Sequence, residues 1–222
     1  MSSKTEPEVL LCDNHVLGLA KPVCMPTVPD ESGDLSLLDW AREWVRQEFE
    51  KPGGVFLGVV HRLDRPVSGV VVFGRTSKGA SRLSDAWRRG VVAKTYLGIC
   101  EGELPGERGA WTQWLVKDRA RNLVVVAEEG SKDAKEARTG WRVLKVAGGK
   151  TWVELKPETG RPHQLRVACA SLGAPFVGDV KYGASSPLPD RSIRLHAASL
   201  AIPHPVKEEG LDLSCPAPFP GL

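Results

Sequence analysis

The run Val70–Phe73, four apolar residues of which three are β-branched, is the feature that most restricts how this chain can fold. A short continuous run of this kind is typical of a strand that is buried on both faces. Directly before it stands HRLDRPVSG, in which Asp64 is the one acidic residue and lies between Arg62 and Arg65. The sequence therefore predicts a buried strand with a charged loop at its start.

Three further segments have the apolar spacing or the end signals of helices. They are Leu35–Phe49 with Asp34 or Ser36 as its cap, 76–90 with Thr76 or Ser77 as its cap, and Arg161–Leu172 with Pro162 in its first turn. Strand-like segments, separated by turn residues, make up most of the remainder. They are two short strands around Asp13 and Asn14, then Lys94–Cys100, Thr112–Val116, Leu123–Ala127, Ala137–Val146, Trp152–Leu155 and Leu195–Ile202, with a hairpin signal at 148–150. The pattern predicts an α+β fold with a mixed, mainly antiparallel sheet and flanking helices.

With 222 residues the chain can bury a real core, and we expect one domain or a domain with a small lobe. Its net charge of +3 is too small to indicate a nucleic-acid partner by itself. The cations are clustered, however, and local basic stripes favour phosphate partners. The clusters are Arg88, Arg89 and Lys94, then Lys117, Arg119 and Arg121, then Arg161 with Arg166.

Several classes of protein do not fit the sequence. Five scattered cysteines without a CxxC pair predict free thiols in a reducing compartment. The first residues lack the apolar core of a signal peptide, and no run approaches the ~20 apolar residues of a membrane span. We therefore expect a soluble, cytoplasmic protein. HExxH, Walker A and GxGxxG motifs are absent, so we expect neither a metal nor a cofactor.

Asp64 allows two interpretations. It can be a structural loop aspartate that forms an ion pair with Arg62 or Arg65. It can also be a nucleophile or acid–base group, because a nearby arginine favours the ionised carboxylate, which can attack an electrophilic carbon.

The segment ETGRPHQLRVACASLG, 158–173, is a second candidate. In a helix that starts near Arg161, His163 and Arg166 share one face, which can bind phosphate or hold a carboxylate. The alternative is a surface helix with solvated basic residues. Tyr96, in a predicted strand, can stack on a base or be a core tyrosine with a satisfied hydroxyl.

The order of the candidate segments is more specific than any one of them. It runs LAKPVCMPTVP, HRLDRPVSGVVVFGRT, KTYLGICEG, TGRPHQLRVACASLGAPFVGDVKYG, LHAASLAIPHP. This order resembles the RluA-type pseudouridine synthases, which isomerise uridine in structured RNA. The resemblance runs from about Val9 to Val206, and the HRLD-x-x-x-SG and GR-x-HQ-[IL]-R blocks together are its most specific part.

The resemblance implies a pseudouridine synthase fold with a central catalytic cleft and assigns roles to individual residues. Asp64 matches the catalytic aspartate, and Arg62 the arginine that helps to displace the target base. Tyr96 matches the tyrosine that packs on the uracil, and Arg166 the residue that pairs with the aspartate. Other residues of the two blocks are implied to contact substrate or RNA: His61, Arg161, His163 and Leu165, of which Leu165 lines the pocket.

The resemblance is incomplete at three positions. The family usually has threonine at Val67 and Pro162, and often glycine at Cys24. We expect residues 1–8 to be a flexible terminus, 9–206 the catalytic domain and 207–222 a C-terminal tail, with no S4 RNA-binding module.

The implied partner is a transfer or ribosomal RNA, bound by a monomer without a membrane partner. The alternative is a non-catalytic RNA-binding or ribosome-assembly factor that keeps the fold. A third interpretation, a hydrolase that uses Asp64, predicts free uracil or cleaved RNA.

Overall fold

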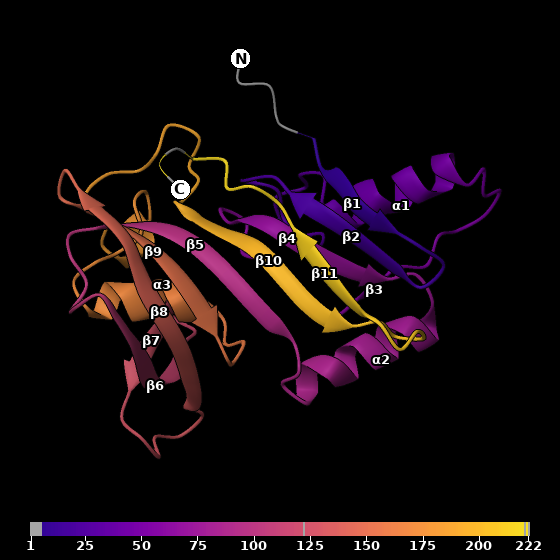
Figure 1. Ribbon diagram of the computed structural model, residues 1–222. Coiled ribbons are helices and arrows are strands. Elements are labelled where there is room, and N and C mark those ends of the chain that lie inside the picture. Colours follow the sequence, from indigo (N-terminus) through magenta and orange to yellow (C-terminus); the bar gives the residue numbers. More distant parts are fainter. Residues whose placement is uncertain (1–5, 122, 220, 222) are drawn as a thin grey trace. The chain divides into compact units, whose positions relative to one another are not determined.

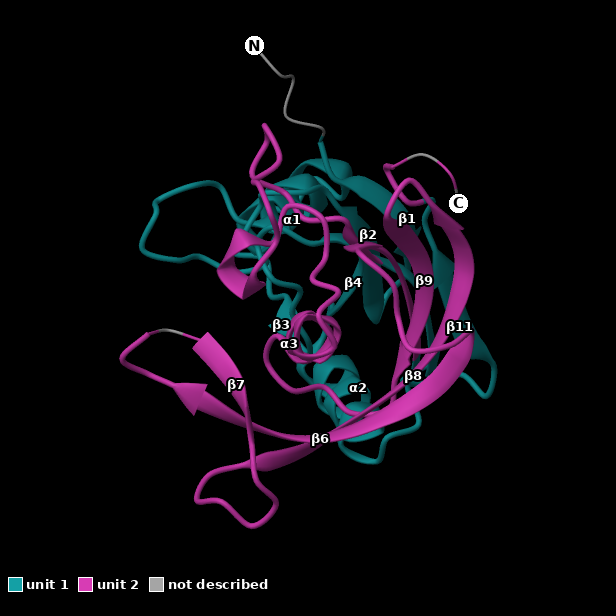
Figure 2. Ribbon diagram, turned by 90° about the vertical axis from the view of Figure 1, so that its left-hand side faces the viewer, with its two compact units in different colours: residues 1–93, 197–216 teal, residues 94–196, 217–222 magenta. Residues whose placement is uncertain are grey.

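The chain forms two compact units in a computed structural model that describes residues 6–121, 123–219 and 221. Residues 1–93 and 197–216 make the first unit, and residues 94–196 and 217–222 make the second (Figure 2). Each unit thus combines stretches that are far apart in the sequence. The sequence predicts one domain or a domain with a small lobe, because periodicity reports which residues are buried but not which segments share a core.

The first unit contains most of the N-terminal half of the chain and a returning C-terminal segment (Figure 1). Its elements are β1 (Glu8–Cys12), β2 (Val16–Lys21), α1 (Leu37–Glu48), β3 (Gly58–Val59), β4 (Ser68–Gly74), α2 (Ser77–Arg88), most of β10 (Leu195–Pro203) and β11 (Gly210–Ser214). Strand β2 pairs with β1 and β4, β3 pairs with β4, and β11 pairs with β10, all antiparallel.

Strand β4 is the centre of this unit, as the apolar run at Val70–Phe73 predicted. All seven of its residues are buried. Its second residue, Gly69, has a φ of 126°, and a Cβ there would lie 2.3 Å from the carbonyl oxygen of Ala197. The close approach of two backbones therefore requires glycine at this position.

The predicted caps of the first two helices are confirmed. The Ser36 hydroxyl accepts a hydrogen bond from the Asp39 amide at the start of α1. The Thr76 hydroxyl accepts one from the Gly79 amide at the start of α2. Each side chain satisfies an amide that has no partner within its helix.

The second unit is built on one run of antiparallel strands. Its elements are β5 (Ala93–Glu101), β6 (Arg108–Asp118), β7 (Leu123–Ala127), β8 (Lys135–Ala147), β9 (Lys150–Pro157), α3 (Gln164–Ser171) and the 3₁₀ turn η1 (Val180–Tyr182). The strand order is β5-β9-β8-β6-β7, so β7 is the last strand on one side. The predicted hairpin joins β8 to β9, and Gly148 and Gly149 have the positive φ angles, 57° and 69°, that a tight two-residue turn needs.

The prediction for the third helix was wrong at its start. Helix α3 begins at Gln164 and not at Arg161, so Pro162 lies before the helix. The Gln164 side chain explains the difference: its oxygen accepts hydrogen bonds from the Arg161 amide and the Thr159 hydroxyl. These contacts fix a turn, in which His163 takes a left-handed conformation with a φ of 52°.

The predicted α+β class, with a mainly antiparallel arrangement of strands and three α-helices in the described residues, is confirmed. Part of the segment expected to be a C-terminal tail forms β11. The expected flexible N-terminus falls largely on residues 1–5, outside the described residues, and β1 already begins at Glu8. Among the residues that the structure describes, no helix is long and apolar enough to cross a membrane.

Candidate active site

The loop that carries Asp64 leads from β3 into β4 and is fixed on both sides of the carboxylate. The Leu63 amide donates to the Thr27 hydroxyl at 3.2 Å, and that hydroxyl donates to the Leu63 carbonyl at 2.8 Å. After the aspartate, the Val67 amide donates to the Asp64 carbonyl at 3.0 Å and closes a turn. Asp64 itself is half-buried, so its backbone is held while its side chain keeps some exposure.

A buried lysine is hydrogen-bonded to the backbone of this loop. Lys21, at the end of β2, is 1% exposed. Its Nζ donates to the carbonyl oxygens of Pro22 (3.0 Å), Met25 (2.7 Å) and Arg65 (3.2 Å). Burial lowers the pKa of Lys21 to about 7, while the negative charge of Asp64 acts in the opposite direction.

Lys21 is a residue that the sequence analysis did not assign to the site. The only signal was its place in LAKPVCMPTVP, the first segment of the resemblance. Its side chain joins that segment to the Asp64 loop, because it bonds to carbonyls of both.

Arg65 belongs to a different network. Its guanidinium pairs with Asp30 at 3.3 Å and with Asp34, and it donates to the Ser32 hydroxyl at 2.8 Å. Arg65 therefore holds the loop 30–34 through its ion pairs. This gives Arg65 a structural role that is distinct from the ion pair with Asp64 considered above.

His61 and Arg62 have different surroundings: His61 contacts β4 and Trp87, and Arg62 is exposed. The His61 ring stacks on Trp87, with centroids 4.5 Å apart and planes 22° apart. Its Nε2 accepts a hydrogen bond of 3.0 Å from the Val72 amide of β4, which fixes the tautomer with the proton on Nδ1. Arg62, the next residue, is exposed. His61 thus anchors the loop to β4, and Arg62 is the residue of this pair that faces solvent.

In the second unit, Arg166 forms a buried ion pair. Its Nε and Nη2 each donate to a carboxylate oxygen of Asp179 at 2.7 Å. Arg166 is 5% exposed and Asp179 is 1% exposed. Two parallel hydrogen bonds between buried, charged groups fix the plane of the guanidinium. Asp179 stands in GDVKYG, within the fourth segment of the resemblance, which implied no role for it.

Tyr182 connects Arg166 with His163. The Arg166 guanidinium lies over the Tyr182 ring, 4.9 Å from its centroid. The Tyr182 hydroxyl shares a hydrogen bond of 2.6 Å with Nδ1 of His163 and accepts one of 3.1 Å from the Val124 amide. The prediction that His163 and Arg166 share a helix face was wrong, because His163 lies before the helix. Both residues instead contact Tyr182.

The remaining predicted site residues lie in the second unit and are at least partly buried. Leu165 is buried in the first turn of α3. Arg161 donates from its Nε to the Glu136 carbonyl of β8 at 2.8 Å. Tyr96 is half-buried in β5, opposite Leu155 of β9.

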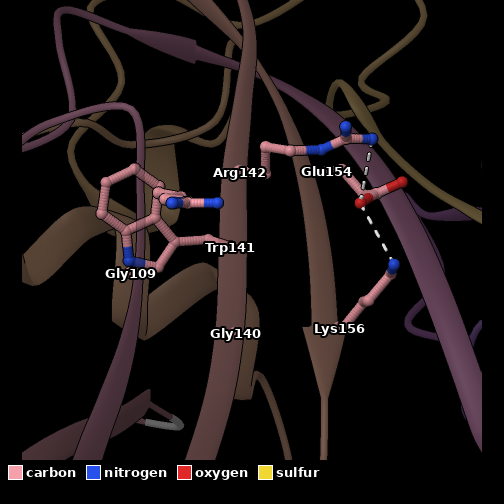
Figure 3. A pocket seen from close by; sticks show the side chains of 7 residues that line it. Gly109, Gly140, Trp141, Arg142, Glu154 and Lys156 are labelled. Carbon is pink, nitrogen blue, oxygen red and sulfur yellow. Dashed lines mark ion pairs between the residues drawn. The ribbon is translucent and has the colours of Figure 1, made fainter.

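A hollow on the second unit contains none of the predicted site residues. It holds about 690 Å³ and is lined by Arg108, Gly109, Gly140, Trp141, Arg142, Glu154 and Lys156 (Figure 3). Glu154 pairs with Arg142 at 3.4 Å and with Lys156 at 3.3 Å, as the dashed lines show. This carboxylate offsets part of the basic charge at the rim of the hollow.

Within residues 6–121, 123–219 and 221, no group of three or more histidine, cysteine or acidic side chains could hold a metal ion. The five cysteines, all of which lie within these residues, form no disulfide.

The chain is similar to known proteins over most of its length. Residues 15–171 match the profile of a family described as RNA pseudouridylate synthase. The chain is 34% identical, over 96% of its length and 93% of the relative, to an uncharacterized RNA pseudouridine synthase of Zymomonas mobilis. It is 29% identical, over 93% of its length and 67% of the relative, to ribosomal large subunit pseudouridine synthase C of Rickettsia prowazekii.

A solved structure supports the same conclusion. Human RNA pseudouridylate synthase domain containing 4 superposes with a TM-score of 0.80 at 25% identity, covering 95% of this chain and 88% of that one. The chain belongs to the RNA pseudouridine synthase family, of the RluA type, and the members of this family are isomerases that act on RNA.

Proposed function

We propose that this protein converts uridine to pseudouridine in a structured transfer or ribosomal RNA, with Asp64 as the nucleophile. The observation that carries the proposal is the construction of the Asp64 loop. Thr27 and Lys21 hold its backbone on either side of the aspartate through three hydrogen bonds to main-chain groups of residues 63 and 65. A backbone fixed in this way presents one carboxylate in a set position, which a nucleophile requires.

The chemistry is an isomerisation in which all atoms balance. The bond between N1 of uracil and C1′ of ribose breaks, the base rotates, and C5 bonds to C1′. The proton on C5 leaves and N1 gains one, so the product has the composition of the substrate. Asp64 can attack C1′, add to C6 of the ring, or promote elimination to a glycal, and each route needs one ionised carboxylate.

Arg166 and Tyr96 complete the proposed catalytic set. Arg166 is proposed to act on the carboxylate of Asp64 in the reaction, as the resemblance implies. Asp179 already offsets the positive charge of Arg166. We therefore infer that Arg166 serves mainly to orient the Asp64 carboxylate and contributes less through its net charge. Tyr96 is proposed to pack on the uracil.

We propose that Arg62 provides the most direct contact with RNA, since it is exposed and adjoins the anchored His61. A flat guanidinium can fill the space that the extruded base leaves. His61, Arg161, His163 and Leu165 were predicted to contact RNA as well, and their contacts within the protein favour a supporting role for them. The name of the Rickettsia relative supports ribosomal RNA as a target, and transfer RNA stays a second prediction. The central cleft, the monomeric state and the cytoplasmic location also stay predictions.

The test is Asp64→Asn, which keeps the size of the side chain and removes its charge. Wild-type protein and variant are incubated with transfer RNA and ribosomal RNA, and carbodiimide treatment with primer extension maps pseudouridine. We expect a new stop with the wild type and none with the variant, while both bind RNA equally. Binding without any stop for the wild type would favour the non-catalytic factor, and free uracil would favour a hydrolase.

A further inference from the structure

The Tyr182 hydroxyl joins three elements of the second unit. It belongs to η1, accepts from the Val124 amide of β7 at 3.1 Å, and shares a 2.6 Å hydrogen bond with His163, directly before α3. The ring of the same tyrosine lies under the Arg166 guanidinium. One side chain thus contacts the end strand of the sheet, the start of α3 and the proposed partner of the nucleophile.

The Tyr182 hydroxyl stabilises both of its partners, the Val124 amide and the His163 ring. Among the described residues, strand β7 is the last in its order and pairs only with β6, so an amide on its outer side has no partner strand there. His163 has a φ of 52°, a left-handed conformation that is unfavourable for a non-glycine residue. The hydroxyl satisfies the Val124 amide and holds the His163 ring, and thereby supports this strained turn.

His163 is three residues before Arg166, which is one helical turn. A relaxation of the His163 backbone would therefore rotate the first turn of α3 and move the guanidinium relative to Asp179. Val124 and Val167 belong to one apolar cluster, with Tyr182 packed against it, so β7 and α3 are also joined by packing.

We propose that Tyr182 is a positioning residue, which ties the β6–β7 hairpin to the first turn of α3 and so sets the orientation of Arg166. The inference rests on the proposed function, because it gives Arg166 its role in the reaction. It implies that RNA bound along the cationic turn of this hairpin, which contains Arg119 and Arg121, acts on Arg166 through Tyr182.

The test is Tyr182→Phe, which keeps the ring under Arg166 and removes the hydroxyl. The matched control is Ser171→Ala: Gln113 of β6 donates to the Ser171 hydroxyl at 2.7 Å, so the control also removes a hydrogen bond between the hairpin and α3. Single-turnover rates are measured at saturating RNA. Tyr182→Phe removes both hydrogen bonds of the hydroxyl, to His163 and to Val124. If the bond to His163, worth about 1 kcal/mol, sets the orientation of Arg166, its loss corresponds to a rate about fivefold lower. The RNA dissociation constant should change less than twofold, and Ser171→Ala should keep the wild-type rate.

Equal rates for Tyr182→Phe and Ser171→Ala would overturn the proposal. A second readout is independent of activity: in ¹⁵N spectra, the Arg166 Nε–H signal should shift in Tyr182→Phe and stay in place in Ser171→Ala. If Tyr182→Phe does not fold, His163→Asn and His163→Ala replace it. Asparagine tolerates the left-handed conformation, so we expect it to keep the Arg166 signal, and an unshifted signal in both variants refutes the inference. If the wild type makes no pseudouridine, the proposed function fails while the spectroscopic test still stands.

Discussion

Replacement of Lys21 by methionine should change how the stability of this protein depends on pH. The side chain is 1% exposed and burial lowers its pKa to about 7, against 10.5 for an ordinary lysine. Between these two values the unfolded chain binds one more proton than the folded chain, so the free energy of unfolding rises with pH. The rise approaches about 1.4 kcal/mol per pH unit well above pH 7 and is half that at pH 7.

From pH 7 to pH 8.5 these slopes integrate to about 1.5 kcal/mol. Urea unfolding of the wild type and Lys21→Met at both values measures the effect. The free energy of unfolding of the wild type should rise by about 1.5 kcal/mol more than that of the variant between the two pH values. The contributions of other titrating groups cancel when the two proteins are compared. Lys51→Met, at an exposed position, should show no such change. A difference between wild type and Lys21→Met that is the same at pH 7 and pH 8.5 would refute the burial argument.

Two further predictions concern Asp179 and Arg62. Asp179→Asn leaves the buried Arg166 charge without its carboxylate and should lower the free energy of unfolding by about 3–5 kcal/mol in urea titrations. A loss below about 1 kcal/mol, the range of exposed ion pairs, would show that solvent reaches this pair. Arg62→Ala should weaken RNA binding and make the slope of log affinity against log salt shallower by about 0.7–0.9. An unchanged slope would mean that Arg62 does not neutralise a phosphate.

Local sequence was sufficient where neighbouring residues decide the structure. The buried strand at Val70–Phe73, the caps Ser36 and Thr76 and the hairpin at 148–150 all followed from periodicity or turn chemistry. The start of α3 did not follow from local sequence. The Gln164 side chain that fixes the turn before the helix is itself held by hydrogen bonds to Arg138 and Thr139, on a strand distant in the sequence.

The motifs of the sequence by themselves determined the family and the candidate residues, because side-chain chemistry at fixed spacing is local information. The tertiary structure decided which groups those residues contact. It placed Lys21 under the Asp64 loop, Asp179 against Arg166, and one tyrosine between β7 and α3. Such contacts join residues that chain order separates. The sequence names the charges, but burial and the distance to a partner, which only folding sets, decide their effect.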